Sequence, residues 1–221
     1  MQSKTPNRNA IILNRINYKD ADKIITLYTD KLGKIRALAK GVRKMNSHRR
    51  GKLEMFNLVR AEFIKYTEWY IITQTDLLKS YSKIKSDPTR INVAYYIAET
   101  FDKLVPLETE DQTLFAFLCK TFDYLEICDP IDLLNAYNIK ILRILGFWDE
   151  KHLENFSEEE KNYLINLLNK KYEEIFLPSE INEPQTKTEA EMISTSVNRK
   201  LRVLTEETLE QKIKTQILYQ S

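Results

Sequence analysis

The chain has 221 residues, of which 43% are apolar and 30% charged, so it is long enough for one large domain or two small ones and has the composition of a soluble globular protein. Residues 1–8 lack the apolar core of a signal peptide, and no apolar run approaches the roughly 18 residues that a membrane-spanning helix needs. We therefore expect a cytoplasmic protein, associated with the nucleoid if it binds DNA.

Charge is divided unevenly along the chain. Residues 1–90 contain 20 Lys and Arg against 8 Asp and Glu, whereas residues 91–221 contain 14 against 24. The basic part includes a stretch, residues 31–53, that has no acid at all. A module of this kind attracts polyanions, because each phosphate that it neutralises releases condensed counterions. We therefore expect nucleic-acid binding; the alternative is a solvated charge run that only maintains solubility.

The first eighty residues have the two-residue periodicity of β-strands, and a plausible turn lies at residues 30–33. Five short strands with one glycine-bounded basic loop fit a small closed barrel of the OB type. A five-stranded sandwich is the competing architecture, since periodicity alone does not distinguish the two. The predicted strands cover residues 10–18, 23–29, 34–40, 55–66 and 69–78.

The third predicted strand, residues 34–40, and the loop after it form the candidate binding surface. Successive side chains of a strand point to opposite faces, so the odd-numbered positions should pack inward and the cations at even positions should form an outer row. The loop at residues 41–52 has glycines at both ends, which let the backbone approach a phosphate closely. Arginine can fork onto phosphate oxygens and stack on bases. The candidate DNA-binding residues are Lys34, Arg36, Lys40, Arg43, Lys44, Arg49, Arg50 and Lys52.

Single-stranded nucleic acid also needs aromatic side chains on which bases can stack. Most aromatic residues of the predicted strands should be core, and we expect only one or two, such as Tyr18 or Tyr66, to be exposed. His48 has no nucleophile or acid nearby in sequence, so it is interpreted as an extra phosphate or base contact. The aromatic residues considered are Tyr18, Tyr28, Phe56, Tyr66, Trp69 and Tyr70.

From Asp87 the apolar period changes to 3.6, which predicts an α-helical bundle. Asp87 and Asp129 each precede a proline, and Thr109 and Ser157 each begin a capping-box pattern. The helix that begins after Asp129 is the third in chain order, and Gly146 is placed to end it. Pro178 should end a fourth helix, residues 179–187 have the composition of a linker, and residues 188–219 predict one or two helices broken around Leu204-Thr205. We expect an α+β protein with an OB-fold domain at residues 1–82 and an α-helical domain at 83–221.

Motifs for catalysis or metal binding are absent from the sequence. The only cysteines, Cys119 and Cys128, do not form a CxxC pair, and both histidines, His48 and His152, are distant from them. The two thiols should be free and buried. The acidic clusters at Glu158–Glu160 and Glu206-Glu207 begin helices, where capping and the helix dipole account for them. We expect no enzyme activity, no cofactor and no metal.

Several short motifs follow one another in a known order. The most specific is Ala39–Ser47, AKGVRKMNS, which matches the pattern akGxRkxxS. Others are Ala10–Leu13, Tyr18–Ile24 with Thr29 and Gly33 after it, Ala94–Glu99, and Leu145-Gly146-Phe147. In this order they resemble the bacterial recombination mediator family RecO, strongly over residues 10–80, moderately to residue 148 and faintly beyond.

The resemblance implies an OB barrel followed by a helical domain. It also implies binding to single- and double-stranded DNA, strand annealing, and help in loading recombinase onto DNA coated by single-stranded DNA-binding protein. The implied partners are RecR, the C-terminal tail of single-stranded DNA-binding protein and, indirectly, RecA. Lys140 and Arg143 are candidates to receive that acidic tail, beside Tyr137 and Ile144 on the third helix.

This chain departs from the family at one point, and the sequence leaves other functions open. Many relatives carry a four-cysteine zinc site after the LGF motif, but residues 148–181 contain no cysteine. The first alternative function is an RNA-binding OB module. The second is a protein-interaction adaptor whose basic face contacts an acidic partner.

Overall fold

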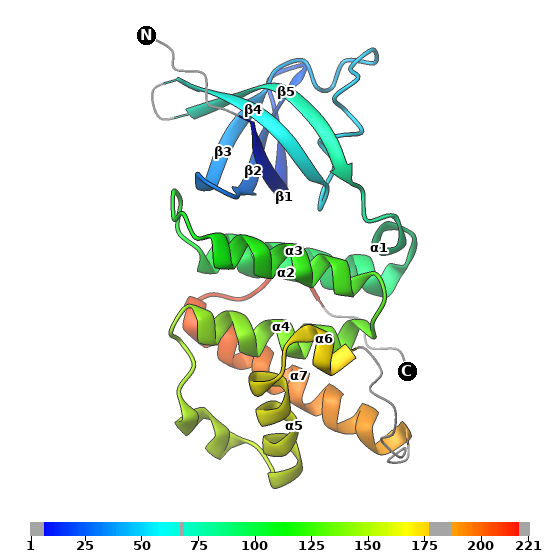
Figure 1. Ribbon diagram of the computed structural model, residues 1–221, viewed down its shortest axis with the longest axis vertical. Coiled ribbons are helices and arrows are strands. Elements are labelled where there is room, and N and C mark those ends of the chain that lie inside the picture. Colours follow the sequence, from blue (N-terminus) through cyan, green and yellow to red (C-terminus); the bar gives the residue numbers. More distant parts are fainter. Residues whose placement is uncertain (1–6, 67–68, 177–186, 217–221) are drawn as a thin grey trace. The chain divides into compact units, whose positions relative to one another are not determined.

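The computed structural model describes residues 7–66, 69–176 and 187–216 (Figure 1). They fall into two compact units, one made of residues up to 85 together with 98–122, the other of residues 86–97 together with those from 123 onward. The predicted division into domains at residues 1–82 and 83–221 stays a prediction. Among the described residues, no helix is both long and apolar enough to cross a membrane.

Five strands form a closed barrel in the first unit. Their order around the barrel is β1-β2-β3-β5-β4, with β1 returning to β4, and only the contact between β3 and β5 is parallel. This closed order is that of an OB-type barrel, so the predicted α+β fold class is confirmed and the sandwich is wrong. The strands are β1 Arg8–Tyr18, β2 Asp22–Thr29, β3 Gly33–Ala39, β4 Leu58–Tyr66 and β5 Trp69–Lys79.

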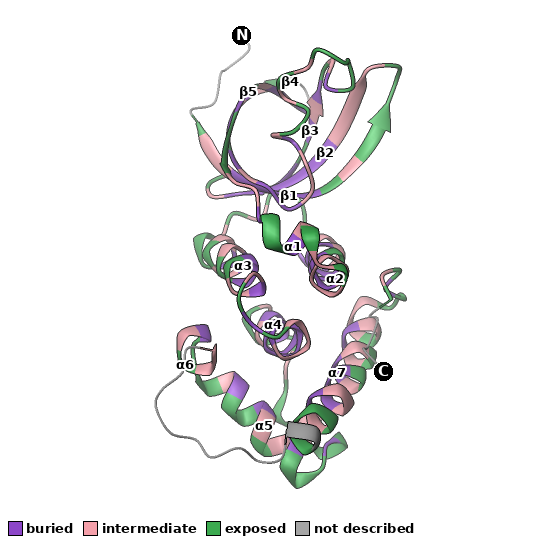
Figure 2. Cartoon of the chain, turned by 90° about the vertical axis from the view of Figure 1, so that its right-hand side faces the viewer, coloured by how far each residue is buried: buried purple, intermediate pink, exposed green. Residues whose placement is uncertain are grey.

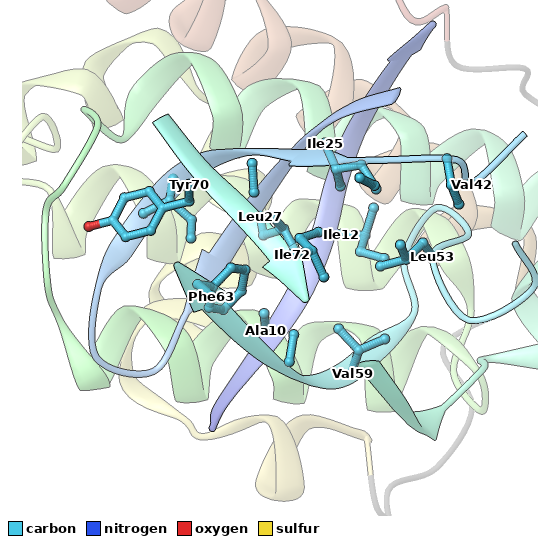
Figure 3. Close-up of a cluster of buried hydrophobic side chains, with 14 residues drawn as sticks. Ala10, Ile12, Ile25, Leu27, Val42, Leu53, Val59, Phe63, Tyr70 and Ile72 are labelled. Carbon is cyan, nitrogen blue, oxygen red and sulfur yellow. The ribbon is translucent and has the colours of Figure 1, made fainter. Parts of the chain in front are cut away.

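Every strand of the barrel contributes buried apolar residues to one core cluster, and Figure 2 colours buried stretches of the barrel purple. In β3, the side chains of Ile35, Ala37 and Ala39 are buried, as the alternation predicts. Figure 3 shows the core cluster extending from Tyr70 at one end to Val42 and Leu53, from the loop after β3, at the other. The loop therefore contributes to the same core as the strands.

The predicted start of the fourth strand at residue 55 is wrong, because β4 begins at Leu58. Phe56 has a φ of 68°, which a strand does not allow. The Asn57 side chain donates from Nδ2 to the carbonyl oxygens of Gly51 and Lys52, at 3.0 and 2.9 Å. Residues 55–57 thus close the basic loop instead of extending the sheet.

Two helices, α2 Pro88–Leu104 and α3 Gln112–Leu125, frame a connecting segment that is held against the barrel. Within the first unit, the Tyr28 ring meets that of Phe101 edge to face at 4.8 Å, and its hydroxyl donates to the carbonyl oxygens of Thr109 and Asp111, each at 3.3 Å. Burial, with the charge of Asp111, raises the pKa of Tyr28 to about 12, so the hydroxyl keeps its proton at physiological pH. A short helix, α1 Ser82–Ser86, precedes α2.

Gly33, at the start of β3, lies against the same segment. Its φ is +63°, and a Cβ at this position would come within 2.2 Å of the Thr109 carbonyl oxygen. Both the backbone conformation and the close approach therefore require glycine.

We predict that Gly33→Ala lowers the free energy of unfolding by about 2 kcal/mol or more, because alanine is strained at positive φ and must displace backbone. Gly51→Ala is the matched control: it has no neighbouring atom within 4 Å and no positive φ, so it should change stability by no more than about 1 kcal/mol. Thermal or urea unfolding of both variants decides this, and equal stabilities would contradict the prediction.

The second unit is helical. Ser157 forms the predicted capping box, and Asp129 accepts from the backbone nitrogens of Ile131 and Asp132 as predicted. In the first unit, by contrast, Asp111 and not Thr109 caps α3, since its Oδ1 accepts from the backbone nitrogen of Thr113 at 2.7 Å. The helices are α4 Pro130–Ile144, the 3-10 helix η1 Glu150–Asn155, α5 Glu158–Asn169, α6 Tyr172–Phe176 and α7 Lys187–Leu209.

The predicted break at Leu204-Thr205 is wrong, because α7 continues to Leu209. Thr205 is fully buried and donates from its hydroxyl to the Leu201 carbonyl oxygen at 2.8 Å, an arrangement that a helix interior accommodates. Gly146, with a φ of +78°, follows α4 as predicted. Pro178 and most of the predicted linker lie outside the described residues.

Polar groups fix how α4, α5 and α7 pack in the second unit. The Asp132 carboxylate accepts from the Tyr163 hydroxyl at 2.9 Å and from the Ser194 hydroxyl at 2.5 Å. Burial alone would raise the pKa of Glu160, but hydrogen bonds from Lys200, Ser196 and the Ser157 backbone hold it below its usual value. These carboxylates are therefore used in packing.

Candidate nucleic-acid interface

The basic loop, defined here as residues 40–57, is held in place at several points. Val42 and Leu53 are buried in the barrel core. The backbone nitrogen of Gly41 donates to Asp22 Oδ1 at 2.7 Å, and that of Arg43 donates to the Ala21 carbonyl oxygen at 2.9 Å. The loop thus has a fixed course along the β1–β2 turn, while its tip is open, with Met45 94% exposed.

Three of the eight predicted DNA-binding cations are engaged in internal contacts. Arg49 donates from its two terminal nitrogens to the carbonyl oxygens of Ile72, at 2.9 Å, and Lys40, at 2.7 Å. Lys52 Nζ donates to the Thr75 carbonyl oxygen at 2.9 Å and lies 3.3 Å from Asp76 Oδ1. The third is Lys34. Arg49 and Lys52 therefore tie the loop to β5, and their side chains already have partners.

The prediction that Lys34 joins the outward cationic row is wrong. The residue is only 6% exposed, and its Nζ lies 3.0 Å from Asp102 Oδ1 and also donates to the Asp102 carbonyl oxygen. The backbone of Leu107 pairs with Lys34 in a parallel bridge and covers this end of β3. The alternation of β3 is correct, but a segment distant in sequence lies over one of its outer positions.

The remaining five cations point to solvent. Arg43 is exposed and uses one guanidinium nitrogen to donate to the Lys19 carbonyl oxygen at 3.1 Å, which leaves its other donors open. The other four have no ion pair with any residue that the structure describes. They are Arg36, Lys40, Lys44 and Arg50.

An open hollow of about 480 Å³ lies among these cations. Lys40 and Lys44 line it, together with Lys19, which the sequence analysis missed because it belongs to the β1–β2 turn and not to the basic stretch. Two carboxylates, Asp20 and Asp22, line it as well, and Asp22 accepts from the Gly41 backbone nitrogen. Three cations thus face two carboxylates, and the hollow has the size and a small excess of positive charge that suit a phosphate group.

Lys23 lies close to these cations. Burial is the main cause that lowers the pKa of Lys23 below its usual value, and the charges of Arg15, Arg43 and Arg50 add to it against Glu54. Positive charge gathered in this way favours an anion nearby.

Three of the six candidate aromatic side chains are exposed. Tyr18 is 39% exposed and Tyr66 55%, as the sequence suggested for one or both. Trp69, the first residue of β5, is a third exposed ring at 43%, one more than the one or two that the sequence predicts. The core contains Tyr28, Phe56 and Tyr70.

Lys140 and Arg143, the candidate partner-binding cations, belong to α4, and their side chains reach the C-terminal end of α5. Lys140 Nζ donates to the Lys170 carbonyl oxygen at 2.6 Å, and Arg143 donates to that of Leu168 at 3.2 Å. Carbonyls at a helix C-terminus lack intrahelical partners, so these cations stabilise the end of α5. Burial and the neighbouring Arg143 lower the pKa of Lys140.

Neither Cys119 nor Cys128 forms a disulfide. Cys128 is buried as expected, which raises its pKa to about 11, but Cys119 is only partly buried, so that part of the expectation is wrong. Within the described ranges, no three or more His, Cys, Asp or Glu side chains gather in a way that could hold a metal ion. His48 is exposed on the basic loop.

A closed five-stranded barrel with an exposed cationic loop, followed in the chain by helices, defines the class: a two-part OB-fold protein. Residues 1–81 match the sequence family described as "Recombination protein O N terminal", and residues 85–213 match "Recombination protein O C terminal". The chain therefore belongs to the recombination protein O family, and the resemblance to RecO drawn from its motifs is confirmed.

Individual relatives carry the same family name. The DNA repair protein RecO of Thermoanaerobacter sp. (strain X514) is 33% identical over 141 residues, which cover 62% of this chain and 56% of that protein. The DNA repair protein RecO of Roseiflexus sp. (strain RS-1) is 34% identical over 148 residues, which cover 66% of this chain and 52% of that protein. The match thus spans little more than half the length of these curated relatives.

We predict that Lys34→Ala destabilises the protein by about 2–3 kcal/mol, because it leaves the largely buried carboxylate of Asp102 without its partner. It should not change the salt dependence of DNA binding, since Lys34 does not reach solvent. Lys31→Ala, which removes an exposed cation from the same stretch, is the control and should leave stability nearly unchanged. Calorimetric unfolding measures both; equal melting temperatures would refute the structural role.

Proposed function

We propose that this protein is a DNA repair and recombination mediator that acts by binding and not by catalysis. It binds single- and double-stranded DNA through the basic face of the barrel, anneals complementary strands and helps load recombinase onto DNA coated by single-stranded DNA-binding protein. Membership of the recombination protein O family supports the general role, and relatives named DNA repair protein RecO agree with it.

One observation carries the DNA-binding part of the proposal: five exposed cations lie on one strand and the loop that continues it. Arg36 and Lys40 lie on and directly after β3, and Arg43, Lys44 and Arg50 lie in the basic loop. A row of this kind follows a phosphate backbone without reading its sequence. Because it neutralises negative charge, it also lowers the repulsion between two strands that approach each other, which is what annealing requires.

We predict that changing Lys40, Arg43, Lys44 and Arg50 together to Ala leaves the fold intact, since none of these side chains belongs to the core. Affinity for single-stranded DNA should fall with little regard to sequence. Each phosphate contact contributes about 0.7 to the slope of log affinity against log salt, so the slope should flatten by up to ~3 units. Annealing should slow in parallel. Fluorescence anisotropy at several salt concentrations gives the slope.

The matched control removes four exposed cations from elsewhere in the chain and therefore changes the net charge equally. It carries Ala at Lys120, Lys151, Lys170 and Lys171. This control should keep the wild-type slope, because net charge alone acts weakly at a distance in salt. An unaltered slope in the folded barrel variant would show that DNA binds elsewhere.

The same titration separates the two alternative functions. An RNA-binding module would bind a single-stranded RNA more tightly than the DNA of matched sequence and length. A protein-interaction adaptor would bind neither at moderate salt. The proposal requires strong binding to DNA in this comparison.

The proposed protein partners are RecR, the C-terminal tail of single-stranded DNA-binding protein and, indirectly, RecA; family membership is what supports them. Tyr137, expected beside these cations, is fully buried and offers no surface to the tail. The exposed apolar residues near Lys140 and Arg143, at the end of α4, are Ile144 and Phe147, which are 40% and 45% exposed. Arg143 uses one guanidinium nitrogen on α5 and keeps further donors for a carboxylate.

We predict that the tail peptide binds the wild type and that Lys140→Ala/Arg143→Ala weakens it about tenfold, since two charge contacts at a surface are lost. Isothermal titration calorimetry measures this, with Lys151→Ala/Lys171→Ala as the charge-matched control. Unchanged affinity in the first variant would reject these two residues, and no binding to wild type would reject this partner.

A further inference from the structure

A second hollow in the barrel unit lies where β3 and β5 stop pairing. The parallel contact between these strands is limited to two pairs, Ala37 with Tyr70 and Leu38 with Ile71. Toward the start of β3, Lys34 pairs with Leu107 instead. The opening left at this point has a volume of about 370 Å³, which is enough for one planar ring system and the atoms bonded to it. Its lining comprises Lys34, Ile35, Arg36, Trp69, Tyr70, Leu107 and Glu108.

The lining is mainly apolar and includes one accessible aromatic ring. Trp69 is 43% exposed and Leu107 48%, although both are large hydrophobic residues. Tyr70 is 6% exposed and belongs to the core, where its ring meets Phe63 edge to face. An exposed tryptophan at the edge of an apolar hollow is suited to stack on a flat partner.

The charges around the hollow show which kind of flat partner fits. The Lys34 cation is paired with Asp102, so it offers no charge to a ligand. Glu108 contributes an exposed carboxylate, and its nearest cation, Lys65, lies 3.6 Å away and is itself half exposed, so the pairing is weak. A carboxylate in the lining repels a phosphate but accepts hydrogen bonds from N–H groups. Arg36 is exposed and has no acidic partner among the described residues, so it can bind a phosphate at the mouth of the hollow.

We propose that this hollow is a base-binding pocket for single-stranded DNA: one unpaired nucleobase stacks on Trp69, its N–H edge faces Glu108, and its phosphate binds Arg36. The proposal rests on the proposed function, and it explains how the protein distinguishes an unpaired strand from a duplex. The basic loop attracts any phosphate backbone, whereas the pocket takes a base only when that base is out of a duplex. Arg36 connects the two sites, because it lines the pocket and lies on β3, the strand that leads into the loop.

The test uses the full chain with Trp148→Phe, which leaves Trp69 as the single tryptophan of the two in the sequence. Tryptophan emission is measured during titration with oligodeoxycytidine, an abasic strand of equal length and a blunt duplex. Anisotropy of labelled strands, in separate samples, reports binding itself. Emission should be quenched by oligodeoxycytidine alone, while all three ligands bind through the basic loop.

Two variants measure how much the pocket contributes. Trp69→Ala should weaken binding of oligodeoxycytidine about 5- to 100-fold, the range for losing one base–aromatic stack. Its affinity for the abasic strand and the duplex, and its salt slope, should stay at wild-type values. Trp69→Phe keeps a stacking ring and should retain most of the affinity, which guards against loss of folding in the alanine variant.

The outcomes separate the two proposals. Unchanged emission while anisotropy shows binding, or equal loss of affinity for abasic and base-bearing strands, overturns the pocket and leaves the proposed function standing. If wild type binds no DNA at all, the proposed function fails and the pocket with it.

Discussion

The closure of the barrel between β3 and β5 is the constraint on which the candidate sites depend. Only two residue pairs make this contact, yet they fix β3 so that its small apolar residues fill the core and Arg36 faces out. The basic loop begins directly after β3 and returns its Val42 and Leu53 to that core. Where the contact ends, Leu107 of segment 105–111 pairs with the edge of β3 at Lys34. The proposed base-binding pocket lies at that point.

The basic loop holds its exposed cations in fixed positions, which matters for the free energy of the proposed DNA binding. Its backbone is hydrogen-bonded to the β1–β2 turn, and Arg49 crosses to β5. Ordering a flexible loop on binding would cost conformational free energy, so a loop that is already ordered leaves more of the electrostatic attraction for affinity. In the proposed DNA binding, the engaged cations thus act indirectly, through the position that they give to their exposed neighbours.

Much of this arrangement follows from local sequence, and the rest depends on distant contacts. The alternation of β3, the cap at Asp129 and the capping box at Ser157 involve neighbours within four residues, so pattern alone predicts them. Lys34 is different, because its exposure is decided by Asp102, 68 residues away. Arg49 depends in the same way on the Ile72 carbonyl, and the exposure of Trp69 depends on where β5 begins. The family was recognisable from ordered motifs, whereas the roles of individual cations were not.

The anchoring of the basic loop also bears on how such a protein can evolve. The buried contacts lie near the two ends of the loop, at Val42 and Leu53, while the side chain of Met45 at the tip is almost fully exposed. Residues at the tip can therefore change in identity, and even in number, at little cost to folding, since loop-closure entropy rises slowly with length. Selection could adjust the reach and charge of this surface to a new nucleic-acid geometry while the barrel beneath it stays the same.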